Sequence, residues 1–195
     1  METFKPIDEG IERIESIVNS MYEFAGTGKE EMKPCNVHMT LVYALRIILN
    51  RSKHIAPISI NGELFSALTS YDALGCLTMG VSNRLEQAWI IIVNNALDEF
   101  EKGTIAYENR RIDIDFKCDN ESISIIISDN AGGIPKGMVE GIFDFAVGSD
   151  KKKSMGIGLN VAKAIIDKHG GDIHASNRDN GAVFEIVLKS YKENN

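Results

Sequence analysis

The sequence predicts an α+β fold, a two-layer α/β sandwich in which helices cover one face of a mixed sheet, preceded by one long N-terminal helix. Three observations lead to this prediction. Helical and strand patterns alternate along most of the chain, as in layered α/β structures. Two pairs of period-two segments are joined by short polar turns, as in β-hairpins. A helical apolar seam precedes this alternation.

Residues 6–25, PIDEGIERIESIVNSMYEFA, are predicted to form the N-terminal helix. Pro6 suits its first turn, and Asp8 and Glu9 favour the positive end of the helix dipole. Its apolar residues alternate four and three apart: Ile7, Ile11, Ile14, Val18, Met21 and Ala25. Such a seam fits either packing on the helix's own domain or membership of an intermolecular bundle. GTGKEEMKP, residues 26–34, has the composition of a linker.

The remaining elements are predicted from their periodicity. Three more helices are expected, over residues 38–51, 82–100 and 156–171. The expected strands are a short one at 56–60 and two hairpins, 111–118 with 122–128 and 172–177 with 182–189. Residues 61–80 have no clear period and stay unassigned.

Composition excludes several classes of protein. No apolar stretch approaches the ~20 residues that cross a bilayer, and the N-terminus lacks the features of a signal peptide. The three cysteines are scattered, which argues for a reducing compartment and against zinc or a disulfide framework. With 21 basic and 28 acidic residues, the net charge of −7 makes a nucleic-acid partner improbable. Positive charge gathers only at residues 151–153, KKK.

Three polar islands interrupt the apolar elements. Asn95 lies in a helix after a run of large aliphatic residues, where its amide oxygen could serve a hard cation such as Mg²⁺. SDNAGGIP, residues 128–135, places Asp129 at the end of a buried strand, although a turn alone explains its glycines. In KKKSMGIGL, residues 151–159, two glycines open a helix whose free amides could bind an anion.

Two familiar phosphate-binding motifs do not fit. The glycines near residue 156 follow no strand and the sixth position of the motif is Val161, so a Rossmann fingerprint is excluded. GTGKEE has neither the spacing nor the hydroxyl of a P-loop.

The order of the three islands resembles the GHKL ATP-binding fold, known as the Bergerat fold, over roughly residues 33–190. VNNALDEF is similar to the family's N-box, SDNAGGIP to its first glycine box, IFDFA (142–146) to its F-box and GIGLNVAKAIIDKHGG to its second glycine box. Arg84-Leu-x-Gln87 and the GIGL form resemble sensor histidine kinases of two-component systems. The resemblance implies that residues 1–28 carry the second helix of a dimerisation hairpin with a linker, and that 29–195 form the catalytic domain.

The resemblance also implies roles for particular residues. Asp129 would hold the adenine amino group, with Gly133 and Ile134 beside the ring, while position 131 is alanine and has no assigned role. Asn95 would be the catalytic residue that ligates Mg²⁺. Residues 144–155 would form the ATP lid, hinged by Phe143 and Phe145. The expected phosphate-binding residues are Lys151, Lys152, Lys153, Gly156, Ile157, Gly158 and Leu159.

Two positions depart from the family pattern. Ile91 replaces a polar residue that in gyrase-type ATPases is the glutamate that activates water, so steady hydrolysis is improbable. Transfer to an imidazole needs no such base, because neutral imidazole is already a nucleophile. Asp98 stands where many kinases have lysine; we expect it on the helix surface.

None of the four histidines fits an acceptor motif, so we expect the phosphorylated histidine to lie outside this chain, which alone should not autophosphorylate. The expected cofactors are ATP and Mg²⁺, and the expected partners are a histidine-bearing hairpin of the same kinase, a response regulator receiver domain and a second copy of the full-length protein.

The expected location is the cytoplasm, with membrane anchorage of the parent protein left open. Two alternatives remain, a serine kinase of the anti-sigma-factor type and a nucleotide-binding interaction module without turnover.

Overall fold

The structure is a computed structural model, and it describes residues 31–66, 75–144 and 157–192. The helix predicted over 6–25 lies outside these residues. All described residues belong to one compact unit, Glu31–Asn195. No helix in the described ranges is long and apolar enough to span a bilayer.

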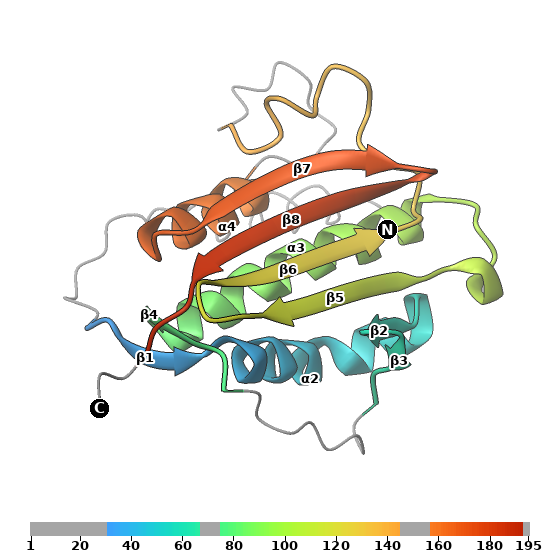
Figure 1. The fold of residues 1–195 in the computed structure, drawn as a ribbon. Helices are drawn as coiled ribbons and strands as arrows, with labels where there is room; N and C mark the ends of the chain where they lie inside the picture. Colours follow the sequence, from blue (N-terminus) through green and yellow to red (C-terminus); the bar gives the residue numbers. More distant parts are fainter. Residues whose placement is uncertain (1–30, 67–74, 145–156, 193–195) are drawn as a thin grey trace, which may run out of the picture. The chain divides into compact units, whose positions relative to one another are not determined.

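The described residues form a six-stranded sheet in the order β3-β2-β5-β6-β8-β7 (Figure 1). Its strands are β2 (Ile58–Ile60), β3 (Glu63–Leu64), β5 (Ile112–Cys118), β6 (Ser122–Asp129), β7 (Asp172–Arg178) and β8 (Gly181–Lys189). β2 and β5 pair in parallel and every other neighbouring pair is antiparallel, so the predicted mixed sheet is confirmed. Both predicted hairpins, β5–β6 and β7–β8, are present.

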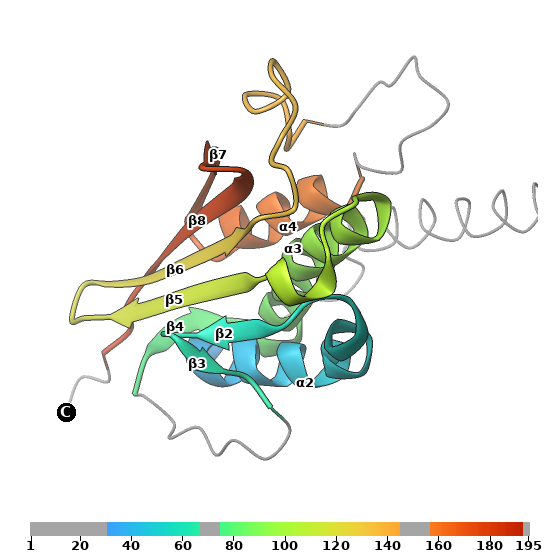
Figure 2. The same cartoon turned by 90° about the vertical axis from the view of Figure 1, so that its right-hand side faces the viewer.

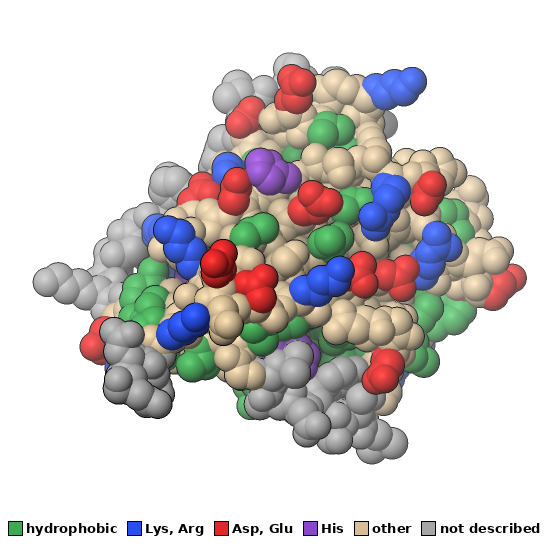
Figure 3. All heavy atoms as spheres, in the orientation of Figure 1, with side chains coloured by type: hydrophobic (Ala, Val, Ile, Leu, Met, Phe, Trp, Pro, Cys, Tyr) green, Lys and Arg blue, Asp and Glu red, His purple; other side chains and the backbone are tan. Residues whose placement is uncertain are grey.

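Three helices cover one face of this sheet, as Figure 2 shows: α2 (Val37–Ile55), α3 (Ser82–Lys102) and α4 (Ile157–Lys168). Period two in β6 directs Ile123, Ile125 and Ile127 into the core, where all three side chains are buried. Trp89 of α3 is also fully buried, and its Nε1–H donates to Thr40 Oγ1 of α2 at 3.0 Å. The other face of the sheet carries interspersed acidic and basic side chains (Figure 3), as expected for a sheet with one solvated face. The two-layer sandwich is therefore confirmed.

Part of the unassigned stretch 61–80 forms one strand of a separate two-stranded ribbon. β1 (Lys33–Asn36) pairs antiparallel with β4 (Leu77–Gly80), with Cys35 opposite Thr78. Lys33 and Pro34, predicted as linker, therefore belong to a strand. Residues 67–74 lie outside the described ranges.

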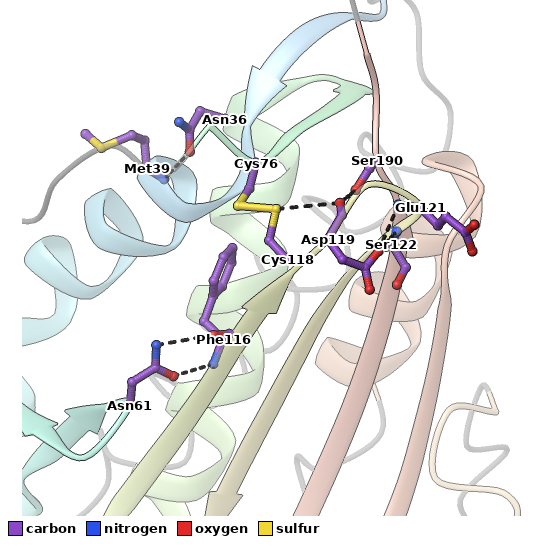
Figure 4. The surroundings of a disulfide bond; sticks show 10 residues. All are labelled: Asn36, Met39, Asn61, Cys76, Phe116, Cys118, Asp119, Glu121, Ser122 and Ser190. Atoms are coloured by element: carbon purple, nitrogen blue, oxygen red, sulfur yellow. Dashed lines mark hydrogen bonds between the residues drawn. A yellow bond between two sulfur atoms is a disulfide. The ribbon is translucent and has the colours of Figure 1, made fainter.

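Cys76 and Cys118 form a disulfide, so the expectation that the cysteines form no disulfide is wrong for this pair (Figure 4). The sheet brings the end of β5 beside the residue that precedes β4, with the two Cα atoms 6.0 Å apart. Their separation of 42 residues hides this proximity in the sequence. The remaining cysteine, Cys35, is a buried free thiol.

Candidate functional site

Asp129 is the last residue of β6 and is partly buried. Its Oδ1 accepts hydrogen bonds from the Ala131 N–H at 2.8 Å and from the Ala182 N–H at 3.3 Å. Burial raises the pKa of this carboxyl; the two hydrogen bonds partly oppose the rise, and the charge of Glu99 adds to it. A carboxylate held at this energetic cost is typical of a functional group.

The glycine turn, residues 130–134, follows Asp129 directly. Gly132 and Gly133 have φ values of +116° and +78°, which disfavour other residues. A Cβ at Gly133 would lie 2.9 Å from Asn177 Oδ1, so glycine is also required here for contact with β7. The side chain of Ile134 is buried.

Two asparagine side chains fix the ends of this turn. Asn130 Oδ1 accepts from the Arg111 N–H at 2.9 Å, and its Nδ2 donates to the Asn109 carbonyl at 2.8 Å. Asn177 Oδ1 accepts from the Ile134 N–H at 2.7 Å, and its Nδ2 donates to the Ile134 carbonyl at 2.8 Å.

The β7–β8 connection also contacts the turn. The Gly132 N–H donates to the Asn180 carbonyl at 2.9 Å. Gly181 packs directly on the main chain of Asp129, where any Cβ would overlap the Asp129 carbonyl oxygen. The turn is therefore enclosed by main chain and by short polar side chains.

One face of α3 extends from the start of α4 to the neighbourhood of Asp129. Ile91, Asn95 and Glu99 are spaced four apart, so they share this face and cover about 12 Å of the helix. At one end, Ile91 Cγ2 lies 3.3 Å from where a Cβ of Gly158 would stand. At the other end, Glu99 is close enough for its charge to act on Asp129. Asn95 lies between, so Asp129, Asn95 and the described start of α4 at Gly158 lie along the same side of α3.

The structure separates the roles of the two neighbouring asparagines. Asn94 Oδ1 accepts from Arg51 of α2 at 2.7 Å. Asn95 is half-buried, and no hydrogen bond to another described residue engages its side chain. Arg51 also pairs with Asp98 at 2.5 Å and with Glu101 at 2.6 Å. Asp98 is exposed, as expected for a residue on the helix surface, and it is held toward α2.

The start of α4 is tied to the segment after the glycine turn. Asn160 Nδ2 donates to the Phe143 carbonyl at 2.8 Å, and its Oδ1 is buried without a hydrogen-bond partner among the described residues. The Phe143 ring meets Phe184 of β8 edge to face at 6.3 Å between centroids. Leu159 is buried in the core, so only its main chain is left to contact a ligand.

Several predicted site residues lie outside the described ranges. These are Phe145, Lys151, Lys152, Lys153 and Gly156, with the side chain of Ile157 and nearly all of the predicted lid.

Sequence reasoning missed Asn177 and Glu99. Glu99 follows Asn95 by one helical turn, a spacing that could have indicated it. Asn177 is far from the turn in sequence, and only the order of β6, β8 and β7 explains its position.

A partly buried acid at a strand end, a glycine turn and a glycine-containing helix start, all bordering one helix face, define an ATP-binding domain of the GHKL type. The chain belongs to the family of histidine kinase-, DNA gyrase B-, and HSP90-like ATPases, whose pattern matches residues 80–192. The predicted resemblance to sensor histidine kinase catalytic domains is confirmed, and ATP is the nucleotide that the family implies.

Curated relatives are sensor kinases. The chain is 41% identical to the sensor protein KdpD of Escherichia coli over 81 residues, which cover 40% of this chain and 9% of KdpD. It is 33% identical to the histidine-protein kinase ArlS of Staphylococcus haemolyticus over 120 residues, which cover 58% of this chain and 25% of ArlS. It is 24% identical to the sensor protein VanS of Enterococcus faecium over 188 residues, which cover 90% of this chain and 44% of VanS. The chain thus spans less than half the length of each of these relatives.

Solved structures share the fold. The nucleotide-free catalytic domain of the histidine kinase ThkA superposes with a TM-score of 0.61 at 22% identity, covering 82% of this chain and 96% of that domain. ThkA in complex with the response regulator protein TrrA gives a TM-score of 0.70 at 22% identity, covering 97% of this chain and 52% of ThkA.

Proposed function

We propose that this chain binds Mg²⁺-ATP and transfers the γ-phosphoryl group to a histidine outside the chain, as the catalytic part of a two-component sensor kinase. The observation that carries the proposal is the α3 face, on which Asn95 lies between Asp129 and the start of α4. A nucleotide laid along this face would meet an acceptor for its base and a helix start for its phosphates.

We assign a role to each site residue, and for Asp129, Gly133 and Ile134 the described surroundings support it. Asp129 accepts from the adenine amino group, while its Oδ1 keeps the bonds from Ala131 and Ala182. The main chain of Gly133 and Ile134 borders the base. Main-chain amides at 156–159, with Lys151, Lys152 and Lys153, hold the phosphates.

Asn95 is the residue we assign to Mg²⁺. Its side chain has no competing hydrogen bond among the described residues, and a neutral amide oxygen suits this hard cation. When bound, Mg²⁺ would supply charge neutralisation on the phosphate oxygens.

The chemical step needs no base from this chain. The imidazole nitrogen of the acceptor attacks the γ-phosphorus, the bond to the bridging oxygen breaks, and ADP leaves. Ile91 packs near Gly158. Because its side chain is a hydrocarbon, this position offers no carboxylate to activate water. Asp98 is paired with Arg51, which offsets its negative charge.

Partners follow from this role. We propose that residues 1–28 belong to the dimerisation hairpin and its linker and that residues 29–195 are the catalytic domain. The acceptor histidine would lie on the hairpin of the same kinase, in a homodimer, and a receiver domain would take the phosphoryl group. The TrrA complex of ThkA supports a receiver as partner. We place the chain in the cytoplasm, where ATP is available.

A transfer assay tests the proposal. The chain is mixed with γ-labelled ATP, Mg²⁺ and a separately produced hairpin domain that carries the acceptor histidine. We expect label on the hairpin that is lost in acid and kept in base, as for phosphohistidine. Acid-stable, base-labile label would instead support a serine kinase, and nucleotide binding without transfer would support an interaction module.

A further inference from the structure

The Asn177 side chain closes a two-bond ring with the main chain of a single residue, Ile134. The Ile134 N–H donates to its Oδ1 at 2.7 Å, and its Nδ2 donates to the Ile134 carbonyl at 2.8 Å. A side-chain amide thereby reproduces the paired bonds that a neighbouring strand would make. β7 is the edge strand of the sheet, so it has no further strand beyond it in the described residues to provide such pairing.

The glycine turn needs this support because its own backbone is permissive. Gly132 and Gly133 lie in succession at positive φ, and glycine loses more conformational freedom on ordering than any other residue. Asp129 precedes the turn, and its Oδ1 accepts a hydrogen bond from the Ala131 N–H within the turn. Any shift of the turn therefore also shifts the Ala131 N–H, one of the two donors that orient Asp129.

The turn is held at both ends by the same device. Asn130 holds its start to residues 109–111, and Asn177 holds its end to β7. The Asn177 bond is the more specialised of the two, because Gly133 must lack a Cβ for the amide to fit: a Cβ there would lie 2.9 Å from Asn177 Oδ1.

We infer that Asn177 is a positioning residue of the nucleotide site: it fixes Gly133 and Ile134 beside Asp129 before the adenine base arrives. This inference rests on the proposed function. Preorganising the turn reduces the entropy that nucleotide binding would otherwise lose, so Asn177 increases affinity without touching the phosphates or Mg²⁺.

The test compares Asn177→Ala with Ser176→Ala, a neighbouring exposed position on the same strand. Asn177→Ala removes both bonds to Ile134, and we expect Mg²⁺-ADP affinity to fall about three- to tenfold by calorimetry. Ser176→Ala should bind as the wild type does. Asn177→Asp keeps the acceptor for the Ile134 N–H and loses the donor to its carbonyl, so it should also bind more weakly than the wild type.

Hydrogen exchange of the Ile134 amide gives a readout that needs no nucleotide. We expect faster exchange in Asn177→Ala and unchanged exchange in Ser176→Ala, with both variants folded at the assay temperature by circular dichroism. Faster exchange with wild-type affinity in Asn177→Ala would overturn the positioning role, and so would equal loss of affinity in both variants. If the wild type bound no nucleotide, the proposed function would fail, whereas the exchange result would still report whether Asn177 holds the turn.

Discussion

The Asp129 side chain has two roles: it accepts main-chain hydrogen bonds, and we propose that it binds the adenine base. One oxygen is occupied by main-chain donors, and burial together with Glu99 raises the pKa of the group. A raised pKa in the folded state means that folding favours protonation of Asp129 relative to the unfolded chain. Protonated Asp129 therefore stabilises the folded state relative to ionised Asp129. This stabilisation is fully present below the unfolded-state pKa and is lost as the pH rises through the folded-state pKa.

The first prediction concerns the pH dependence of nucleotide binding. The adenine amino group needs an unprotonated carboxylate, so Mg²⁺-ADP affinity should be higher above the Asp129 pKa than below it. It should decrease as the pH falls through the Asp129 pKa, which lies above the ordinary value of about 3.9. Calorimetry across this range measures the decrease, and Asp129→Asn should lack it. The same pH profile in Asp129→Asn would assign the titration to another group.

The second prediction separates Asn95 from Asn94. Asn95→Ala should weaken Mg²⁺-ADP binding about tenfold, ~1.4 kcal/mol, and leave metal-free ADP binding in EDTA unchanged. Asn94→Ala is the matched control: it removes the Arg51 hydrogen bond and should lower the free energy of unfolding by about 1 kcal/mol, with the Mg²⁺ effect intact. A lost Mg²⁺ effect in Asn94→Ala alone would reverse the assignment.

At the scale of elements, local pattern was enough for two hairpins but missed a third local pair, β2–β3, whose second strand lies in the unassigned stretch 61–80. The β5–β6 and β7–β8 hairpins were predictable because their strands alternate with period two across short turns. The β5–β6 turn is closed by Asp119, whose carboxylate accepts from the Glu121 and Ser122 N–H groups (Figure 4). β1 and β4 could not be predicted, because each has four residues and their partners lie more than 40 positions apart.

The third prediction concerns the disulfide. In the chain-entropy account, a cross-link over a separation of 42 residues stabilises the folded state by about 4 kcal/mol. Added reductant, which mimics the cytoplasm, should lower the free energy of unfolding by up to that amount, and Cys118→Ser should show the same loss without reductant. Chemical denaturation measures both. Equal stability with and without reductant would contradict the prediction.

At the scale of the whole catalytic unit, the antiparallel β5–β6 pair separates two ends of the sheet. Ile112 lies opposite Asp129 at one end, and Cys118 lies opposite Ile123 at the other, about 20 Å away. Reducing the disulfide should therefore leave nucleotide affinity unchanged, which calorimetry on the reduced protein checks.

The sequence was sufficient to find the three polar islands, since each interrupts an apolar element. It could not show that Asn177 joins them, whereas the one-turn spacing from Asn95 could have indicated Glu99. Asn177 reaches Ile134 only because β7 and β8 fold back along β6. Glu99 acts on the pKa of Asp129 only because α3 packs under the sheet.

The central claim is that a single partly buried acid, Asp129, recognises the adenine base. Calorimetric titration of Mg²⁺-ADP into the wild type and Asp129→Asn tests it most directly, with Asp115→Asn on the exposed face of β5 as control. The asparagine keeps Oδ1 for the Ala131 and Ala182 donors but presents an NH₂ to the base. We predict at least about a tenfold loss of affinity, ~1.4 kcal/mol, with no loss of folding stability and no change in Asp115→Asn. Equal affinities of the wild type and Asp129→Asn would contradict the account.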